Sequence, residues 1–198
     1  MPTNDQPRRE RIAEHVRAIL DHLGVDPAAD PEVAETPERV AALALELTTG
    51  LGADPSVAVL PDRSAGRGLV IARDLPFHSL CAHHLLPFFG RAHIGYLPGD
   101  GVVGIGALGR VLDHFASRLQ LQERLGEQVA DFLERTAGAR GVIVFVEARQ
   151  LCMEMRGGKK SGLIQSTASR GAMVDGDLRR EFFGRVLSPR TEEEDERA

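Results

Sequence analysis

The chain has little that would tie it to a membrane or to an oxidising compartment. Its 198 residues contain no apolar run near the roughly 20 residues that span a bilayer, and the first ten residues have no apolar signal core. Only two cysteines are present, Cys81 and Cys152. With no secretory signal, we expect reduced thiols in a cytoplasmic protein rather than a disulfide.

An excess of basic charge is also missing. The chain has 24 Lys and Arg against 29 Asp and Glu, a formal net charge of −5, and the two signs are intermixed. This balance argues against nucleic acid and anionic membranes as partners. Any basic residues that bind an anion must therefore form a local group.

One stretch is rich in groups that bind metals. Residues 77–89 read F-H-S-L-C-A-H-H-L-L-P-F-F, so Cys81 precedes His84 by three residues, with His83 between them. A thiolate and an imidazole at this spacing can reach one ion from a single turn, and sulfur with nitrogen favours zinc. Cys152 is a candidate third ligand. Two Cys and one His would leave a fourth position for water, as in catalytic zinc sites.

The spacing C-x-x-H alone is a weak signal. Free cysteine is among the most buried residue types and commonly packs as a small apolar side chain. From the residues alone, both interpretations of Cys81 stay open.

Composition divides the chain into four parts. Residues 1–9 are polar and expected to be disordered, and residues 188–198 form an acidic tail expected to be disordered. Residues 10–67 are expected to form a helical arm and a linker, with one helix over 11–23 and another starting at Thr36-Pro37 and ending at Gly50. Residues 68–187 are expected to form the catalytic domain.

The body mixes strand and helix patterns. Helices are expected over residues 107–119, 122–136 and 178–186. Strands are expected over residues 69–73, 91–97, 141–147 and 151–155, the last paired with 163–169, while 102–105 is either a strand or the lead into a helix. This order predicts an α+β fold with an antiparallel sheet and two helices on one face. Exposed strand edges favour an oligomer.

Four motifs together resemble the GTP cyclohydrolase I family, over about residues 11–186. They are T-P-E-R-V at 36–40, C-A-H-H-L-L-P-F-F-G with H-I-G-Y-L-P at 81–98, Q-L-Q-E-R-L at 120–125 and C-M-E-M-R-G at 152–157. The resemblance implies the tunnelling fold (T-fold). It also implies a homo-oligomer, a decamer with sites shared between subunits.

The resemblance assigns roles to particular residues. It implies zinc bound by Cys81, His84 and Cys152. It assigns Gln122 and Glu123 to substrate binding. Glu123 would hydrogen-bond the guanine ring, since a carboxylate can accept from the ring N–H and the exocyclic amine. The family's triphosphate-binding arginines match Arg110, Arg156 and Arg39. Without the family, these would be ordinary surface residues.

The implied reaction opens the five-membered ring of GTP. Zinc lowers the pKa of its bound water, and the hydroxide attacks C8 of the purine. His83, next to the ligand His84, is the expected proton donor and acceptor. Formate then leaves, and the family product is 7,8-dihydroneopterin triphosphate.

The sequence departs from the family pattern near the expected site. Gln150 stands where the family usually has His, and an amide cannot shuttle protons. Gly106-Ala107 replaces the usual Ser-Lys, which removes one contact to phosphate that Lys159 or Lys160 could replace. Ala82 replaces Glu.

Three functions therefore stay open. The chain could be an ordinary GTP cyclohydrolase I. It could be a diverged relative that stops at the formamidopyrimidine or takes another guanine nucleotide. It could also be a non-catalytic zinc oligomer that binds such a nucleotide.

Overall fold

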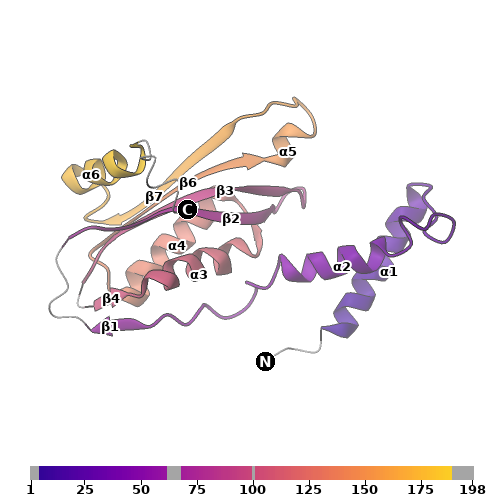
Figure 1. The fold of residues 1–198 in the computed structure, drawn as a ribbon, viewed down its shortest axis with the longest axis horizontal. Helices are drawn as coiled ribbons and strands as arrows, with labels where there is room; N and C mark the ends of the chain where they lie inside the picture. The colour runs from indigo at the N-terminus through magenta and orange to yellow at the C-terminus, as the bar shows by residue number, and fades with distance from the viewer. Residues whose placement is uncertain (1–4, 62–67, 100, 189–198) are drawn as a thin grey trace, which may run out of the picture. The chain divides into compact units, whose positions relative to one another are not determined.

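A computed structural model describes residues 5–61, 68–99 and 101–188 of the chain (Figure 1). The chain divides into two compact units, Met1–Leu51 and Gly52–Ala198. The expected disordered ends lie largely outside the described residues, as do residues 62–67 of the expected linker. None of the described helices has the length and apolar character needed to cross a membrane.

The N-terminal unit is a pair of helices, α1 (Gln6–His22) and α2 (Thr36–Glu46). They pack against each other around small side chains, with Ala13 and Ala41 buried. The predicted start at Thr36-Pro37 matches α2. Helix α1 begins at Gln6, so the expectation of disorder is wrong for residues 6–9, because a proline within the first helical turn is compatible with a helix.

A five-stranded sheet forms the second unit. Its strands are β2 (Val70–Cys81), β3 (Pro87–Leu97), β5 (Leu119–Gln120), β6 (Gly141–Gln150) and β7 (Leu163–Gly171). They lie in the order β5-β2-β3-β6-β7, antiparallel except that the two-residue β5 runs parallel to β2. The predicted α+β tunnelling fold is confirmed.

Two further strands lie outside this sheet. Strand β1 (Val59–Pro61) pairs with β4 (Gly101–Val103), with Val59 opposite Val103. Strand β1 falls within the expected linker, so the second unit begins at Gly52 rather than near residue 68. Three residues are too few for an alternating strand pattern to be detected in the sequence.

Helices cover both faces of the large sheet (Figure 1). On one face lie α3 (Ile105–Ala116) and α4 (Gln122–Ala137), whose apolar sides pack on the inward residues of β6 such as Val144 and Val146. The alternate residues Ile143 and Phe145 point to the opposite face, where α6 (Gly176–Val186) packs through Phe182. The expected pair of helices on one face is confirmed.

One expected strand is a helix. Residues Leu151–Glu154 form the single turn α5, and β7 pairs with β6, with Gln165 opposite Glu147. Leu, Met and Glu are good helix formers, and a short apolar run cannot separate strand from helix. Because β6 runs on to Gln150, the end of this strand and the turn α5 place Gln150 and Cys152 next to each other in space.

Candidate active site

A tight turn after β2 brings the metal-binding side chains together. The backbone N–H of Cys81 donates to the carbonyl of Leu86 at 2.8 Å, and the N–H of Leu85 donates back to the carbonyl of Cys81 at 2.9 Å. Leu85 is in the left-handed region with φ of 55°. Within this turn the ligand atoms of Cys81, His83 and His84 all lie within 4.8 Å of one another.

The second thiol reaches the same group from α5. Cys152 is half-buried, and burial, followed by the neighbouring Cys81 thiol, raises the pKa of Cys152. His84 Nδ1 lies 3.6 Å from Cys81 Sγ, while its Nε2 contacts the guanidinium of Arg156. The structure thus places the Cys152 thiol beside that of Cys81, while the group whose ligand atoms all lie within 4.8 Å consists of Cys81, His83 and His84. It also places His83 close enough to be an alternative ligand.

These donors suit zinc. Sulfur and imidazole nitrogen are the usual zinc ligands, and two thiols with one imidazole leave room for a further group. In the part of the chain that the structure describes, Cys81, His83 and His84 form the one group of His, Cys, Asp and Glu side chains with spacing for a metal.

A cavity of about 290 Å³ adjoins this cluster. Its polar lining consists of Cys81, His83, Gln120, Gln122, Glu123, Gln150 and Cys152. Its apolar lining consists of Phe88, Leu121, Met153 and Ile164. The cavity therefore combines a metal-binding group, a carboxylate and apolar surface that could contact a planar ring.

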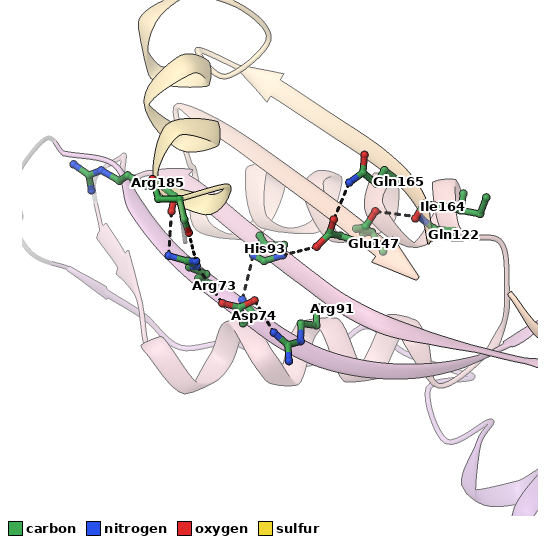
Figure 2. Close-up of polar contacts among 11 residues, drawn as sticks. Arg73, Asp74, Arg91, His93, Gln122, Glu147, Ile164, Gln165 and Arg185 are labelled. Carbon is green, nitrogen blue, oxygen red and sulfur yellow. Dashed lines mark hydrogen bonds and ion pairs between the residues drawn. The ribbon is translucent and has the colours of Figure 1, made fainter. Parts of the chain in front are cut away.

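Two glutamines are joined at the wall of the cavity. Gln122 is buried, and its Nε2 donates to the backbone carbonyl oxygens of Val146 at 3.1 Å and Ile164 at 2.9 Å (Figure 2). Gln150 Nε2 donates to Gln122 Oε1 at 2.7 Å. Both polar ends of the Gln122 side chain thus have partners within the protein, although Gln122 also belongs to the lining of the cavity.

The expected triphosphate arginines are not gathered in this cavity. Arg156 lies beside His84, as described above. Arg110 is exposed on α3 and is absent from the cavity lining that the described residues form. Arg39 lies on α2 of the N-terminal unit, exposed and paired with Glu35 at 2.8 Å.

The structure adds cavity residues that the sequence did not single out. Gln120 is buried and donates to the carbonyl of Phe115 at 2.9 Å. Phe88 and Ile164 supply apolar surface. No local pattern in the sequence indicated that these residues meet at a cavity.

A second polar cluster lies on the other face of the sheet (Figure 2). The ring of His93 is buried and its Nδ1 accepts a hydrogen bond from the backbone N–H of Asp74 at 3.2 Å. Its Nε2 lies 3.6 Å from Glu147 Oε1. Burial lowers the pKa of His93 and outweighs the carboxylates of Asp74 and Glu147, which raise it, while Arg73 lowers it further.

The free energy of unfolding should therefore fall as the pH drops below about 6.5, the ordinary pKa of imidazole. Below this pH His93 binds a proton more readily in the unfolded chain than in the folded protein, because burial lowers its pKa there. Acid therefore favours unfolding. His93→Gln should weaken this pH dependence, measured by urea unfolding between about pH 5 and 8.

The matched control is Thr167→Val. Thr167 is opposite Phe145 on the same sheet and does not titrate in this range, so its replacement should keep the wild-type slope. Equal slopes in the wild type and His93→Gln would contradict the prediction.

Two thiols and two imidazoles beside a small cavity are typical of a class of protein, the metal-binding enzymes that act on small molecules, and this group could hold a metal ion. The family profile described as GTP cyclohydrolase I matches residues 12–187. The chain belongs to the GTP cyclohydrolase I family, which confirms the predicted family and its enzyme class.

Named relatives agree over almost the whole chain. GTP cyclohydrolase 1 of Campylobacter lari is 40% identical, covering 91% of this chain and 96% of that protein. GTP cyclohydrolase 1 of Bifidobacterium longum is 44% identical and that of Aquifex aeolicus 40%, each covering 90% of this chain, and 90% and 96% of their own lengths. Among solved structures, archaeosine synthase QueF-Like in the apo form matches 52% of this chain with a TM-score of 0.40 and 17% identity.

Proposed function

We propose that this chain is a zinc-dependent GTP cyclohydrolase I that opens the five-membered ring of GTP at C8. The observation that carries the proposal is a cavity lined by Cys81, Cys152 and Glu123, with His84 within metal-binding distance of Cys81. We infer the substrate, GTP, and the expected products, 7,8-dihydroneopterin triphosphate and formate, from membership of the family.

The proposed role of each residue follows from the chemistry of its side chain. Zinc held by Cys81, His84 and Cys152 would supply Lewis acidity that makes water a nucleophile near neutral pH. His83 lines the cavity beside them and transfers protons to and from the ring, because imidazole serves both directions near neutral pH. Glu123 accepts hydrogen bonds from the guanine edge, and Arg156 binds phosphate oxygens.

The active assembly is proposed to be a homodecamer in the cytoplasm. Strand β7 is an edge of the sheet, and an unpaired edge is a place where another subunit's strand can add. Ile105, at the start of α3, is 83% exposed, which suits burial in an interface. Sites shared between subunits would give Arg110 and Arg39 a route to the triphosphate. Light scattering after gel filtration tests the subunit count.

One observation favours an arrested reaction as the second candidate. Gln150 replaces the usual histidine and donates a hydrogen bond to Gln122. Its amide has no ionisable group that could transfer a proton. The first hydration and ring opening would then proceed, while formate release is slow and a formamidopyrimidine accumulates.

One assay separates these functions. Zinc-loaded protein is incubated with GTP, and the products are examined for a species heavier by one water, for formate and for pterin fluorescence after oxidation. Formate with pterin supports the complete reaction, and hydrated GTP without formate supports the arrested one. No product would overturn the proposal and point to another substrate or to binding alone.

Replacing Glu123 with glutamine should lower kcat/KM for GTP by about 10- to 100-fold, because each charge-assisted hydrogen bond contributes about 1.5–3 kcal/mol. Selectivity for GTP over inosine triphosphate, which lacks the exocyclic amine, should fall as well. Steady-state kinetics with both nucleotides measure the two effects.

Glu134→Gln is the matched control, since Glu134 lies on the same helix α4 but not among the residues that line the cavity. It should leave both values unchanged. Retained selectivity in Glu123→Gln would count against guanine recognition by this carboxylate.

A further inference from the structure

The amide orientations of Gln122 and Gln150 follow from their neighbours. Gln122 is only 3% exposed, and one end of its amide lies against the backbone carbonyl oxygens of Val146 and Ile164. Carbonyl oxygens only accept, so that end must be the NH₂ group. The other end is then an oxygen, and Gln150 must present its own NH₂ group to it at 2.7 Å.

The orientation of Gln150 leaves its carbonyl oxygen without a hydrogen-bond partner among the described residues. Gln150 lines the cavity with Cys81, His83 and Cys152, at the metal-binding end. Throughout residues 5–61, 68–99 and 101–188, no protein donor contacts this oxygen. The amide cannot flip without placing the Gln150 oxygen against the Gln122 oxygen, so the hydrogen bond to Gln122 decides which end of the Gln150 amide is the acceptor.

An acceptor distinguishes the intact purine ring from the hydrated one. The five-membered ring of GTP carries no N–H or O–H group. Water adds across the N7=C8 double bond, with its oxygen bonding to C8 and a proton bonding to N7. The hydrated ring therefore has a new N7–H donor, and an acceptor beside it stabilises the product of this step more than the substrate.

We propose that Gln122 is a positioning residue that fixes the carbonyl oxygen of Gln150 as an acceptor for the N7–H group formed when water adds to the ring. This proposal rests on the proposed function, because it assumes a guanine nucleotide with its five-membered ring at the metal-binding end. It assigns Gln150 to the hydration step and leaves proton donation in later steps to other groups.

The probe is 8-oxoguanosine triphosphate, which carries N7–H, compared with GTP, which has a lone pair at N7. Dissociation constants for both nucleotides are measured by calorimetry on the zinc-loaded full chain, with turnover of GTP kept low by cooling. The wild type should prefer the 8-oxo nucleotide, and Gln150→Met should reduce this preference by about 3- to 10-fold, the value of one net hydrogen bond.

A double-mutant cycle tests the positioning role. Gln122→Met should reduce the preference as much as Gln150→Met, and the double variant should lose no more than either single variant. If the role of Gln122 were purely structural, Gln122→Met would weaken the binding of both nucleotides equally and leave the ratio of their dissociation constants unchanged. Gln165→Met is the control, since Gln165 donates to Glu147 at 2.8 Å, does not line the cavity and should keep the wild-type ratio.

The possible failures are distinguishable. If Gln150→Met keeps the wild-type ratio while GTP still binds, this inference is wrong and the proposed function stands. If Gln122→Met fails to fold in a thermal melt, the half-buried Gln150 still tests the acceptor through its own variant. If the wild type binds neither nucleotide and makes no product, the proposed function itself is wrong.

Discussion

Replacing Cys152 with alanine is expected to remove zinc from the protein and to lower GTP turnover by more than about 100-fold. Loss of a group that only supports a metal ligand already costs about 10- to 100-fold in metal affinity or activity, and Cys152 would be a ligand itself. Its thiol lies beside Cys81 at the wall of the cavity, so the alanine variant would leave one thiol at this end of the site.

Zinc content is measured by elemental mass spectrometry after gel filtration, together with turnover and the thermal midpoint. Ser161→Ala, an exposed change in the segment that follows α5, is the matched control and should keep both zinc and turnover. Full zinc occupancy in Cys152→Ala would show that His83 completes the ligand set with Cys81 and His84. That result would remove His83 from its proposed role in proton transfer.

Replacing Gln150 with histidine should accelerate formate release by about 10²-fold or more, because restoring a general acid or base typically contributes 10²- to 10⁴-fold. The new ring can donate one N–H to Gln122 Oε1, as the amide of Gln150 does now. Its other nitrogen would then face the cavity and could exchange protons with the substrate. Formate and the hydrated intermediate are measured over time in single-turnover reactions.

Gln150→Met is the comparison, since it removes the amide without adding a titratable group. It should not accelerate formate release. If Gln150→His shows no gain while GTP is still hydrated, proton transfer at this position does not limit the reaction. In that case the absence of a titratable group at position 150 does not explain slow formate release.

Local patterns predicted the elements well where they were long. The helical spacing of apolar residues such as Val129 and Phe132 predicted α4 within one residue at its C-terminal end. The β-branched run at residues 141–147 predicted the first part of β6. The helical turn α5 was predicted as a strand, because four residues carry too little periodicity to decide.

The candidate metal site was predictable in part for a similar reason. Cys81 and His84 are three residues apart, and one tight turn is enough to bring their side chains together. Cys152 could be assigned only by its chemistry and by the family resemblance. Its position next to Cys81 depends on the pairing of β3 with β6, in which Phe88 lies opposite Gln150.

The sequence by itself determined the family, the donor chemistry of Cys81 and His84, and the helices with a sustained apolar face, because each of these depends on residue type and short spacing. Only the tertiary structure decided that Gln122 is bound within the protein and orients Gln150. These two residues are 28 positions apart, and the carbonyl groups that fix the amide of Gln122 come from β6 and β7. Hydrogen-bond partners of this kind are set by sheet register, which no local pattern contains.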